Sequence, residues 1–333
     1  MKVRLKDIAE RANISIAAVS RALSGKSDIS LETRELVCRL AREMGYIPDA
    51  NARSMRTGRS GTIGYLTNYL VTTLNSERTV DLIRELRRHD MKLLFSEFSD
   101  GALEWLLQNN IDALISGTLY IESSAVQVKN IAERYLGRDF PVITFGTVHI
   151  PGTDSVMLDY EDCGYKLASH MYDRGCRNLL VTCGGLHSYR EVGIMRAASE
   201  RGMPAPEILM DNEMSLKSAY LSVKQRLESS RNVPDGILIH NSHTSPAVLT
   251  ALKELGISIP SDMAAASFEN TETDAYMSIP LTSCGFRQAD LTSALLKIIQ
   301  YRMKHKTREK DIVLNISPVL EMRESSFPAP ANS

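Results

Sequence analysis

A short run near the N-terminus carries side chains that could contact a nucleic acid. Residues 16–21 read Ile-Ala-Ala-Val-Ser-Arg, and helical spacing turns Val19 inward while the others face outward. Outward isoleucine and alanine are unusual on a solvated face, but they suit thymine methyl groups and sugar edges. Arginine suits guanine or a phosphate, because its guanidinium donates hydrogen bonds in a planar fork. The candidate contact residues are Ile16, Ala17, Ala18, Ser20 and Arg21.

The neighbouring residues predict the helices that position this surface. Ile8, Ala12 and Val19 fall at helical spacing, so they can close a small core between two short helices. Asn13 takes the turn, because asparagine tolerates a left-handed backbone. Ser15 is a good N-cap, since its hydroxyl can accept from the free amides of the second helix. Two helices crossed in this way fit the DNA major groove, whereas the alternative is a plain helical hairpin packed through its alanines.

A third helix and a distinctive exit follow this pair. Ser30 caps the helix and Gly45 ends it. Its inner face carries an apolar stripe made of Leu36, Val37, Leu40, Ala41 and Met44. The chain then reads Gly-Tyr-Ile-Pro over residues 45–48 and Ala-Arg-Ser-Met-Arg-Thr-Gly-Arg over residues 52–59. With these motifs, residues 3–60 resemble the DNA-binding headpiece of the LacI/GalR family of bacterial transcriptional repressors.

The resemblance implies roles for individual residues. The family's base-reading positions correspond to Ile16, Ala17 and Arg21, and a phosphate-contacting position corresponds to Ser20. Residues 51–55 match a hinge helix that folds only on DNA and pairs with its dimer mate in the minor groove; its implied contacts are Asn51, Ala52 and Met55. Met55 replaces a leucine that wedges into the central base step, and methionine is apolar and adaptable enough to do the same. We therefore expect a homodimer on a near-palindromic, double-stranded DNA operator.

Charge and composition agree with a small DNA-binding module on a larger body. Residues 1–60 carry a net charge of +5 and the remaining 273 residues carry −6. No apolar run approaches the roughly 20 residues of a membrane span, and the polar N-terminus does not suit a signal peptide. Five scattered cysteines without a CxxC pair indicate reduced thiols in the cytoplasm, with no zinc or disulfide framework. The alternative is a redox role for Cys176 and Cys183, which flank a predicted strand.

From residue 61 onward, short apolar strands alternate with longer helices. Strands are expected at 62–66, 92–96, 113–116, 141–145, 155–158, 178–182, 236–240 and 263–267. Helices are expected near 76–89, 101–109, 122–136, 161–174, 188–202, 215–230, 243–255 and 287–304. This order predicts parallel sheets with right-handed crossovers. The pattern breaks near Asp159 and near Cys284 and Gly285, which indicates two doubly wound lobes joined by several crossings.

The same family resemblance extends thinly over this body and implies a fold. The supporting motifs are Val156-x-x-Asp159 with Gly164 and His170, Gly175-Cys176-Arg177, Ile259-Pro260-Ser261-Asp262-Met263 and Pro280-Leu281-Thr282. They imply a two-lobed α/β effector domain like the type I periplasmic binding proteins. Expected bounds are 1–47 for the helix-turn-helix domain, 48–60 for the hinge and 61–324 for the effector domain, with a flexible tail at 325–333. The first lobe is expected to hold about 61–158 and 286–312, and the second about 159–285 and 313–324.

An effector is expected between the lobes, at the carboxyl ends of the strands. The candidate effector contacts are Tyr69, Phe145, Arg190, Asn241 and Glu269. Arg190 precedes Gly193 by three residues, as the family's effector-gripping arginine does, and the alternative is an exposed helix arginine. Tyr69 and Phe145 could stack on a ligand ring or equally be rim or core aromatics. Several carboxylates that clasp sugar hydroxyls in the family are absent or lengthened here, which argues weakly against a neutral hexose held in the usual way and leaves a sugar acid, a phosphosugar or a nucleoside open.

The predicted function is that of a sequence-specific transcriptional regulator, a repressor by family habit, under allosteric control by a small molecule related to carbohydrates. The alternatives are a solute-binding protein and an enzyme on the same two-lobed fold. Export for solute uptake does not suit the polar N-terminus. We find no nucleophile, base and acid at supportive spacing, and we expect neither catalytic residues nor a metal or cofactor.

Overall fold

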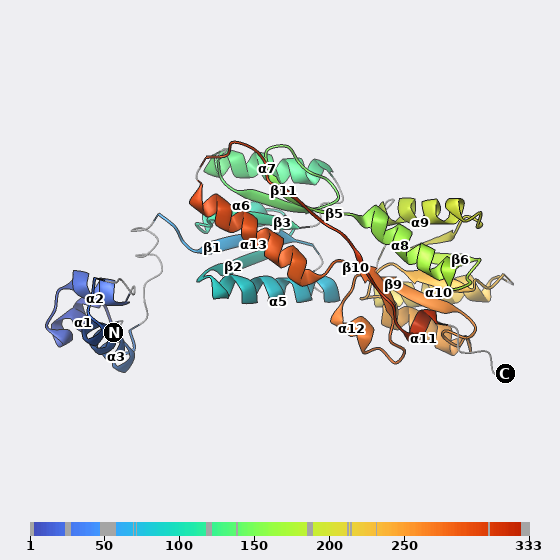
Figure 1. Ribbon diagram of the computed structural model, residues 1–333, viewed down its shortest axis with the longest axis horizontal. Coiled ribbons are helices and arrows are strands. Elements are labelled where there is room, and N and C mark those ends of the chain that lie inside the picture. The colour runs from blue at the N-terminus through green and yellow to red at the C-terminus, as the bar shows by residue number, and fades with distance from the viewer. Residues whose placement is uncertain are drawn as a thin grey trace. The chain divides into compact units, whose positions relative to one another are not determined.

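The computed structural model describes residues 3–23, 28–46, 58–68, 70, 72–117, 122–137, 139–184, 189–211, 213, 215–230, 232–305 and 307–327. The chain divides into two compact units, Met1–Ser60 and Gly61–Ser333 (Figure 1). We call them the helical unit and the α/β unit. The hinge residues Asn51, Ala52 and Met55, and Tyr69 in the α/β unit, lie outside the described residues.

The helical unit contains α1 (Leu5–Ala12), α2 (Ile16–Leu23) and α3 (Leu31–Glu43). Asn13 ends α1 in the predicted left-handed conformation, with φ 52°. The predicted caps are also present, because Ser15 Oγ accepts from the Ala18 amide at 3.1 Å and Ser30 Oγ accepts from the Thr33 amide at 3.2 Å. The three helices close around a core of Ile8, Ala9, Val19, Ala22, Val37, Leu40 and Ala41.

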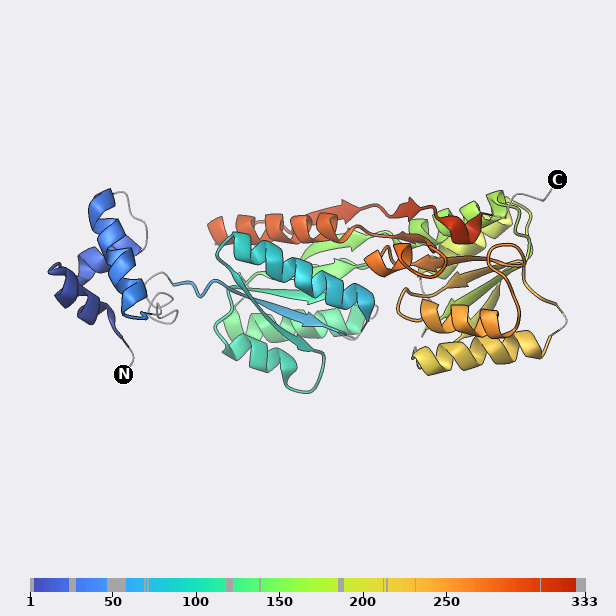
Figure 2. The same ribbon diagram turned by 90° about the horizontal axis from the view of Figure 1, so that it is seen from below.

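The α/β unit contains two six-stranded sheets, each covered by helices on both faces (Figure 2). The first sheet has the order β11-β5-β4-β3-β1-β2 and is parallel throughout. Its strands are β1 (Thr62–Thr67), β2 (Lys92–Glu97), β3 (Ala113–Gly117), β4 (Val142–Gly146), β5 (Asp154–Leu158) and β11 (Val313–Ile316). Its helices are α5 (Thr73–Arg88) and α13 (Gln288–Lys304), packed together on one face, and α6 (Ala102–Gln108) and α7 (Glu122–Leu136) on the other.

The second sheet has the order β12-β10-β9-β8-β6-β7, and only β12 runs antiparallel. Its strands are β6 (Leu179–Cys183), β7 (Glu207–Met210), β8 (Gly236–Ile239), β9 (Ala264–Phe268), β10 (Thr282–Gly285) and β12 (Val319–Glu321). Its helices are α8 (Tyr160–Asp173) with α9 (Tyr189–Glu200), α10 (Leu216–Glu228) with α11 (Ser245–Glu254), and the short α12 (Glu272–Ala275). A 3-10 turn, Glu324–Ser326, closes the described chain. The predicted two-lobed α/β fold is thus confirmed.

The chain crosses between the lobes three times. Two crossings fall where the sequence pattern breaks, between β5 and α8 and between β10 and α13. The expected boundary at residue 312 is wrong, because β11 pairs with β5 and therefore belongs to the first lobe. The third crossing comes after Ile316, between β11 and β12. The strand at 313–316 escaped prediction because its burial alternates at a sheet edge and it is only four residues long.

The expected tail also begins too early. Ser325 and Ser326 are fully buried. Ser325 Oγ donates to the Ala265 carbonyl at 2.6 Å, and Ser326 Oγ lies 2.8 Å from His170 Nε2. In the sequence, polar residues beside a proline-rich segment resemble a flexible tail. In the structure, Ser325 and Ser326 instead pack into the second lobe. No helix among the described residues is long and apolar enough to cross a membrane.

Candidate functional sites

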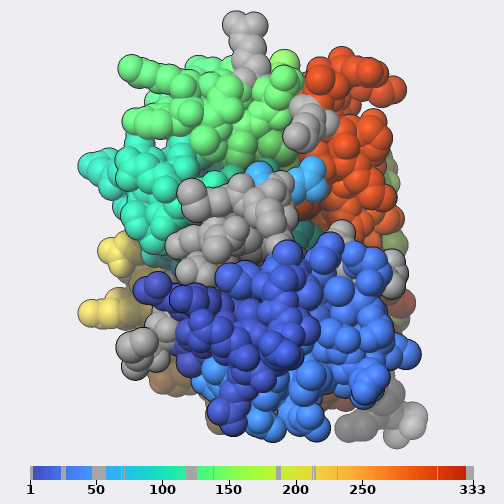
Figure 3. All heavy atoms as spheres, turned by 90° about the vertical axis from the view of Figure 1, so that its left-hand side faces the viewer, coloured from blue at the N-terminus to red at the C-terminus, as the bar shows by residue number. Residues whose placement is uncertain are grey.

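The helix α2 presents the predicted contact surface of the helical unit. Ile16, Ala17 and Arg21 are exposed, Ala18 and Ser20 are partly exposed, and Val19 is fully buried. Arg21 Nη1 lies 3.7 Å from Asp28 Oδ2, and more than half of each side chain is exposed to solvent. Such an ion pair is weak, so it leaves the guanidinium able to exchange Asp28 for an anionic or hydrogen-bonding partner. Figure 3 shows the described atoms of this unit in blue, packed into one continuous cluster.

Arg190 is held at the start of α9 in the second lobe. Helices α8 and α9 touch backbone to backbone, because Gly164 and Gly193 leave no room for a Cβ atom. This contact fixes Arg190, whose side chain is 5% exposed and whose Nη1 donates to the His240 carbonyl at 2.9 Å. The alternative interpretation of Arg190 as an exposed helix residue is therefore wrong.

Two aromatic rings flank the Arg190 guanidinium. Its central carbon lies 4.9 Å from the ring centroid of Tyr160 and 4.8 Å from that of Phe268. Burial, together with the charge of Arg190, lowers the pKa of the neighbouring His240 to about 3. His240 is consequently neutral at physiological pH, so it adds no second positive charge beside Arg190.

Glu269 follows β9 at the carboxyl edge of the second sheet. Its backbone is left-handed, with φ 82°, which is a strained conformation for a residue with a long side chain. Loss of hydration raises the pKa of its carboxyl group to about 7, although the charges of Arg190 and Arg78 oppose the shift. The Ser242 amide lies 3.4 Å from Glu269 Oε2. The structure thus brings the predicted residues Glu269 and Arg190 into one electrostatic environment.

Asn241 is buried after β8, where its side chain has a local structural task. Its Oδ1 accepts from the Thr244 amide at 2.8 Å and from Thr244 Oγ1 at 3.0 Å, just before α11 begins. Asn241 also lines a small pocket of the second lobe, together with Thr182, Asp211, Ala219, His240 and Thr244. It therefore stands near the candidate site and shapes the loop that enters α11.

Phe145 is a core aromatic of the first lobe. It is only 2% exposed at the end of β4, and its ring stacks on Tyr65 with centroids 6.4 Å apart. The Arg78 guanidinium lies 4.8 Å from the Phe145 ring centroid. The burial of Phe145 fits the alternative of a core aromatic, and its ring supports the Arg78 guanidinium.

Sequence reasoning missed Arg78 itself. It lies in α5 with 2% of its surface exposed, and its Nε donates to Gln288 Oε1 at 3.0 Å. Its Nη1 donates to Asn75 Oδ1 at 3.2 Å. The sequence does contain an indication of this residue. Arg78 lies four residues after Leu74 and four residues before Leu82, which places a charge on the buried face of the helix.

A second missed residue is Asp274 of α12, which is fully buried beside Glu269. Its Oδ2 accepts from Ser242 Oγ at 2.8 Å and from the Thr271 amide at 3.0 Å. These bonds hold the loop after β9 against the loop after β8. No cluster of three metal-ligating side chains is found in the described ranges.

The folds and sites together define a class of protein: a helix-turn-helix unit joined to a two-lobed unit like the periplasmic binding proteins. Residues 4–49 match the family model of "Bacterial regulatory proteins, lacI family", and residues 168–326 match the model of the "Periplasmic binding protein-like domain". Over these two segments the chain is similar to the LacI family of bacterial regulatory proteins and to the periplasmic binding proteins.

Full-length relatives and solved structures resemble the chain over nearly all its length. Catabolite control protein A of Priestia megaterium is 22% identical and is covered completely, with 98% of this chain aligned. The HTH-type transcriptional repressor PurR of Klebsiella pneumoniae is 24% identical, with 98% of this chain and 97% of the relative aligned. A structure of the Lac repressor bound to ONPG in the repressed state has a TM-score of 0.81 at 21% identity, over 98% of this chain and 100% of the other.

Proposed function

We propose that this protein is a sequence-specific DNA-binding regulator of transcription, a repressor whose grip on its operator is controlled by a small molecule. The observation that carries the proposal is the exposed face of α2, where Ile16, Ala17 and Arg21 stand on a helix positioned by its turn and caps. Apolar groups on that face suit base edges in the major groove better than they suit water. Ala18 and Ser20 border the same face and complete the proposed contact surface.

The proposal includes a homodimer that binds a near-palindromic operator in the cytoplasm. One Lac repressor structure similar to this chain, with a TM-score of 0.77, is described as a dimer bound to operator and the anti-inducer ONPF. In the proposal, residues 48–60 form the hinge, and Asn51, Ala52 and Met55 contact the minor groove. No catalytic role is assigned to the chain, since its relatives are regulators.

The effector is proposed to bind in the α/β unit at Arg190 and Glu269, with Asn241 and Asp274 shaping the adjoining loops. Support comes from the convergence of these residues at the carboxyl ends of β8 and β9, where α/β sheets bind ligands. A coupling free energy of about 1–3 kcal/mol between the effector and the operator would change DNA affinity by roughly 5–150-fold. Carbohydrates are a reasonable starting point, because a structure similar to this chain is described as a CelR–cellobiose complex.

Selection from a random DNA pool tests the proposed function. The purified full chain is incubated with a random-sequence duplex library at low ionic strength, and bound DNA is amplified over several rounds. We expect a near-palindromic motif, bound about 10³-fold or more tightly than random competitor. An absence of any sequence preference, with and without a metabolite mixture, would overturn the proposal.

A further inference from the structure

Arg78 carries a buried charge that no described carboxylate meets in an ion pair, and the buried Glu269 acts on it only at longer range. Its two hydrogen bonds go to neutral amide oxygens, Gln288 Oε1 and Asn75 Oδ1, and its flat face rests on the Phe145 ring. Across the described ranges, no carboxylate oxygen lies within ion-pair distance of its guanidinium. Its Nη2 takes part in none of the hydrogen bonds among those residues.

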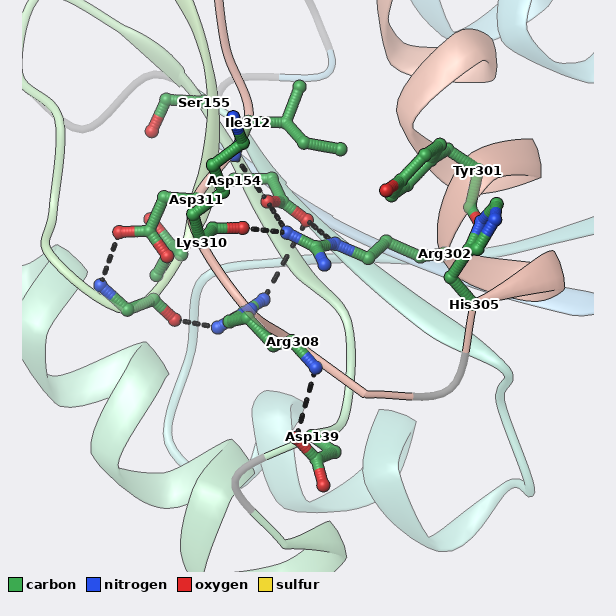
Figure 4. A network of polar contacts seen from close by, with 12 residues as sticks. Asp139, Asp154, Ser155, Tyr301, Arg302, His305, Arg308, Lys310, Asp311 and Ile312 are labelled. Carbon is green, nitrogen blue, oxygen red and sulfur yellow. Dashed lines mark hydrogen bonds and ion pairs between the residues drawn. The ribbon is translucent and has the colours of Figure 1, made fainter.

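Another buried arginine of the same chain, Arg302, is paired with a buried carboxylate. Arg302 donates from Nε to Asp154 Oδ2 at 2.8 Å and from Nη2 to Asp154 Oδ1 at 2.6 Å (Figure 4). Arginine stays charged at all physiological pH values, and burial of an unpaired charge is costly. A protein that keeps such a charge buried on a helix keeps it at a cost in stability, as is common where a ligand supplies the missing partner.

The position of Arg78 connects it to the proposed effector site. Gln288 begins α13 directly after the second crossing, and its Nε2 donates to the Phe286 carbonyl at 3.0 Å. The Phe286 ring meets Tyr160 edge to face, with centroids 5.0 Å apart, and Tyr160 in turn lies beneath Arg190. A chain of contacts therefore runs from Arg78 of the first lobe through Gln288, Phe286 and Tyr160 to Arg190 of the second.

The carboxyl groups of Glu269 and Asp274 form no ion pair with Arg78. The charges of Arg78 and Arg190 both lower the pKa of the Glu269 carboxyl group, but burial keeps this pKa at about 7. The carboxyl group is therefore only partly ionised at neutral pH. Asp274 accepts hydrogen bonds from Ser242 and Thr271 of its own lobe, and burial raises its pKa as well. A neutral sugar would leave the Arg78 guanidinium without an anionic partner.

From this arrangement we infer that the effector is an anionic carbohydrate, whose carboxylate or phosphate group binds the Arg78 guanidinium. The inference rests on the proposed function, because it assumes that the α/β unit binds the controlling ligand. A guanidinium recognises both groups through the same paired hydrogen bonds, so both belong to the inferred class. The anion would give Arg78 the negatively charged partner that Asp154 provides for Arg302.

Matched sets of neutral and anionic sugars test the inference. Thermal shift and calorimetric titration of the full chain would use glucose, glucuronate and glucose 6-phosphate, ribose and ribose 5-phosphate, and inorganic phosphate. We expect at least one anionic probe to raise the melting temperature by 3 °C or more while its neutral partner raises it by less than 1 °C. Arg78→Gln should weaken that anion by at least tenfold.

Two further variants separate binding from folding. Arg84→Gln alters a largely exposed arginine of the same helix, so it should bind the anion within twofold of the wild type. Arg78→Met should raise the melting temperature of the ligand-free protein and abolish the shift caused by the anion, because it removes the buried charge. A variant that melts higher and no longer responds cannot have lost binding through misfolding.

The outcomes distinguish this inference from the proposed function. The inference is overturned if the neutral sugars stabilise the protein and the anions do not, if no anionic probe stabilises the wild type more than Arg78→Gln, or if Arg78→Gln and Arg84→Gln bind alike. Any of these results together with sequence-selective DNA binding would leave the regulator intact and reject only the anionic effector. Loss of sequence-selective DNA binding would instead reject the proposed function.

Discussion

Single side chains of the α/β unit bury charge in two different ways. Arg302 meets a carboxylate that matches its fork, whereas Arg78 meets amide oxygens and an aromatic ring. The first arrangement is complete by itself and stabilises the lobe. The second lacks an anion, so a substitution at Arg78 should change ligand response, whereas a substitution at Asp154 should change stability.

Arg21 offers a direct test of DNA readout by α2. Arg21→Ala should cost about 1–3 kcal/mol of binding at one base pair of the operator and relax specificity there, because a bidentate contact to guanine is lost. Fluorescence anisotropy against a set of single-base operator variants would measure the effect. Arg21→Lys keeps the charge without the fork and serves as the control. Uniform weakening across all variants would instead identify Arg21 as a phosphate contact.

Glu269 should make stability depend on pH in a defined direction. Its pKa is raised from 4.5 to about 7 in the folded state, so the neutral form is favoured on folding. Its contribution to the free energy of unfolding is therefore complete below about pH 4.5 and is lost as the pH rises through 7. Glu269→Gln mimics the neutral form and should become more stable than the wild type by on the order of 1–3 kcal/mol between pH 5 and 8.

Urea unfolding of both proteins across that pH range would measure the difference. Asp274 and Glu77 also have raised pKa values, but both remain in the variant, so their effects cancel in the comparison. His170 likewise cancels, with its pKa lowered by burial and by Arg174. A difference between the two proteins that does not change with pH would contradict the assignment for Glu269.

Among the elements, α2 depends on the turn that precedes it. Asn13 adopts φ 52° and its amide bonds back to the Glu10 carbonyl at 3.3 Å, so the chain reverses within a few residues. Ser15 then caps α2 through the Ala18 amide. These two local devices, together with the buried Val19, set which residues of α2 face outward.

Substitution of Asn13 tests the turn. Asn13→Val should destabilise the helical unit by about 1–2 kcal/mol, since a β-branched side chain is strained in the left-handed region. Asn13→Gly should stay within about 0.5 kcal/mol of the wild type, because glycine adopts that conformation freely. Hydrogen exchange of the α1 and α2 amides in the full chain would report the change. Equal exchange in the two variants would exclude a conformational role for Asn13.

Across the whole α/β unit, the buried Asp154 joins three distant segments. It accepts from Arg302 in α13, from the Ile312 amide before β11, and lies 3.7 Å from Arg308 Nη2 (Figure 4). Arg302 Nη2 also donates to the Lys310 carbonyl at 2.7 Å. This network, at the amino end of β5, fixes the last helix and the last strand of the first lobe to its sheet.

Removal of this carboxylate should be severe. Asp154→Ala leaves two arginines buried without it, and we expect a loss of about 3–5 kcal/mol in the free energy of unfolding. Denaturant unfolding followed by circular dichroism would measure it. Glu207→Ala, which breaks the ion pair to Arg226 at a side chain that is 45% exposed, should cost at most about 1 kcal/mol. Similar losses in the two variants would show that the network contributes no more than a surface pair.

Local patterns in the sequence were enough to predict much of this protein. The turn at Asn13, the caps at Ser15 and Ser30 and the outward face of α2 are set by neighbours within four residues, so spacing and propensity reveal them. The alternation of apolar strands and helices likewise predicted the two parallel sheets, because each central strand is continuously buried. Periodicity says less about very short strands, and β7, β10, β11 and β12, each three or four residues long, were missed.

Only the tertiary structure decided which distant residues share an environment. Arg78 and Gln288 are separated by 210 positions, yet the second crossing places the start of α13 beside α5. The same folding buried Phe145 beneath Arg78, returned β11 to the first sheet and fastened Ser325 and Ser326 to the second. A sequence records the kind of each side chain and its near neighbours, whereas the charge balance of a buried site depends on contacts made after the chain has crossed between lobes three times.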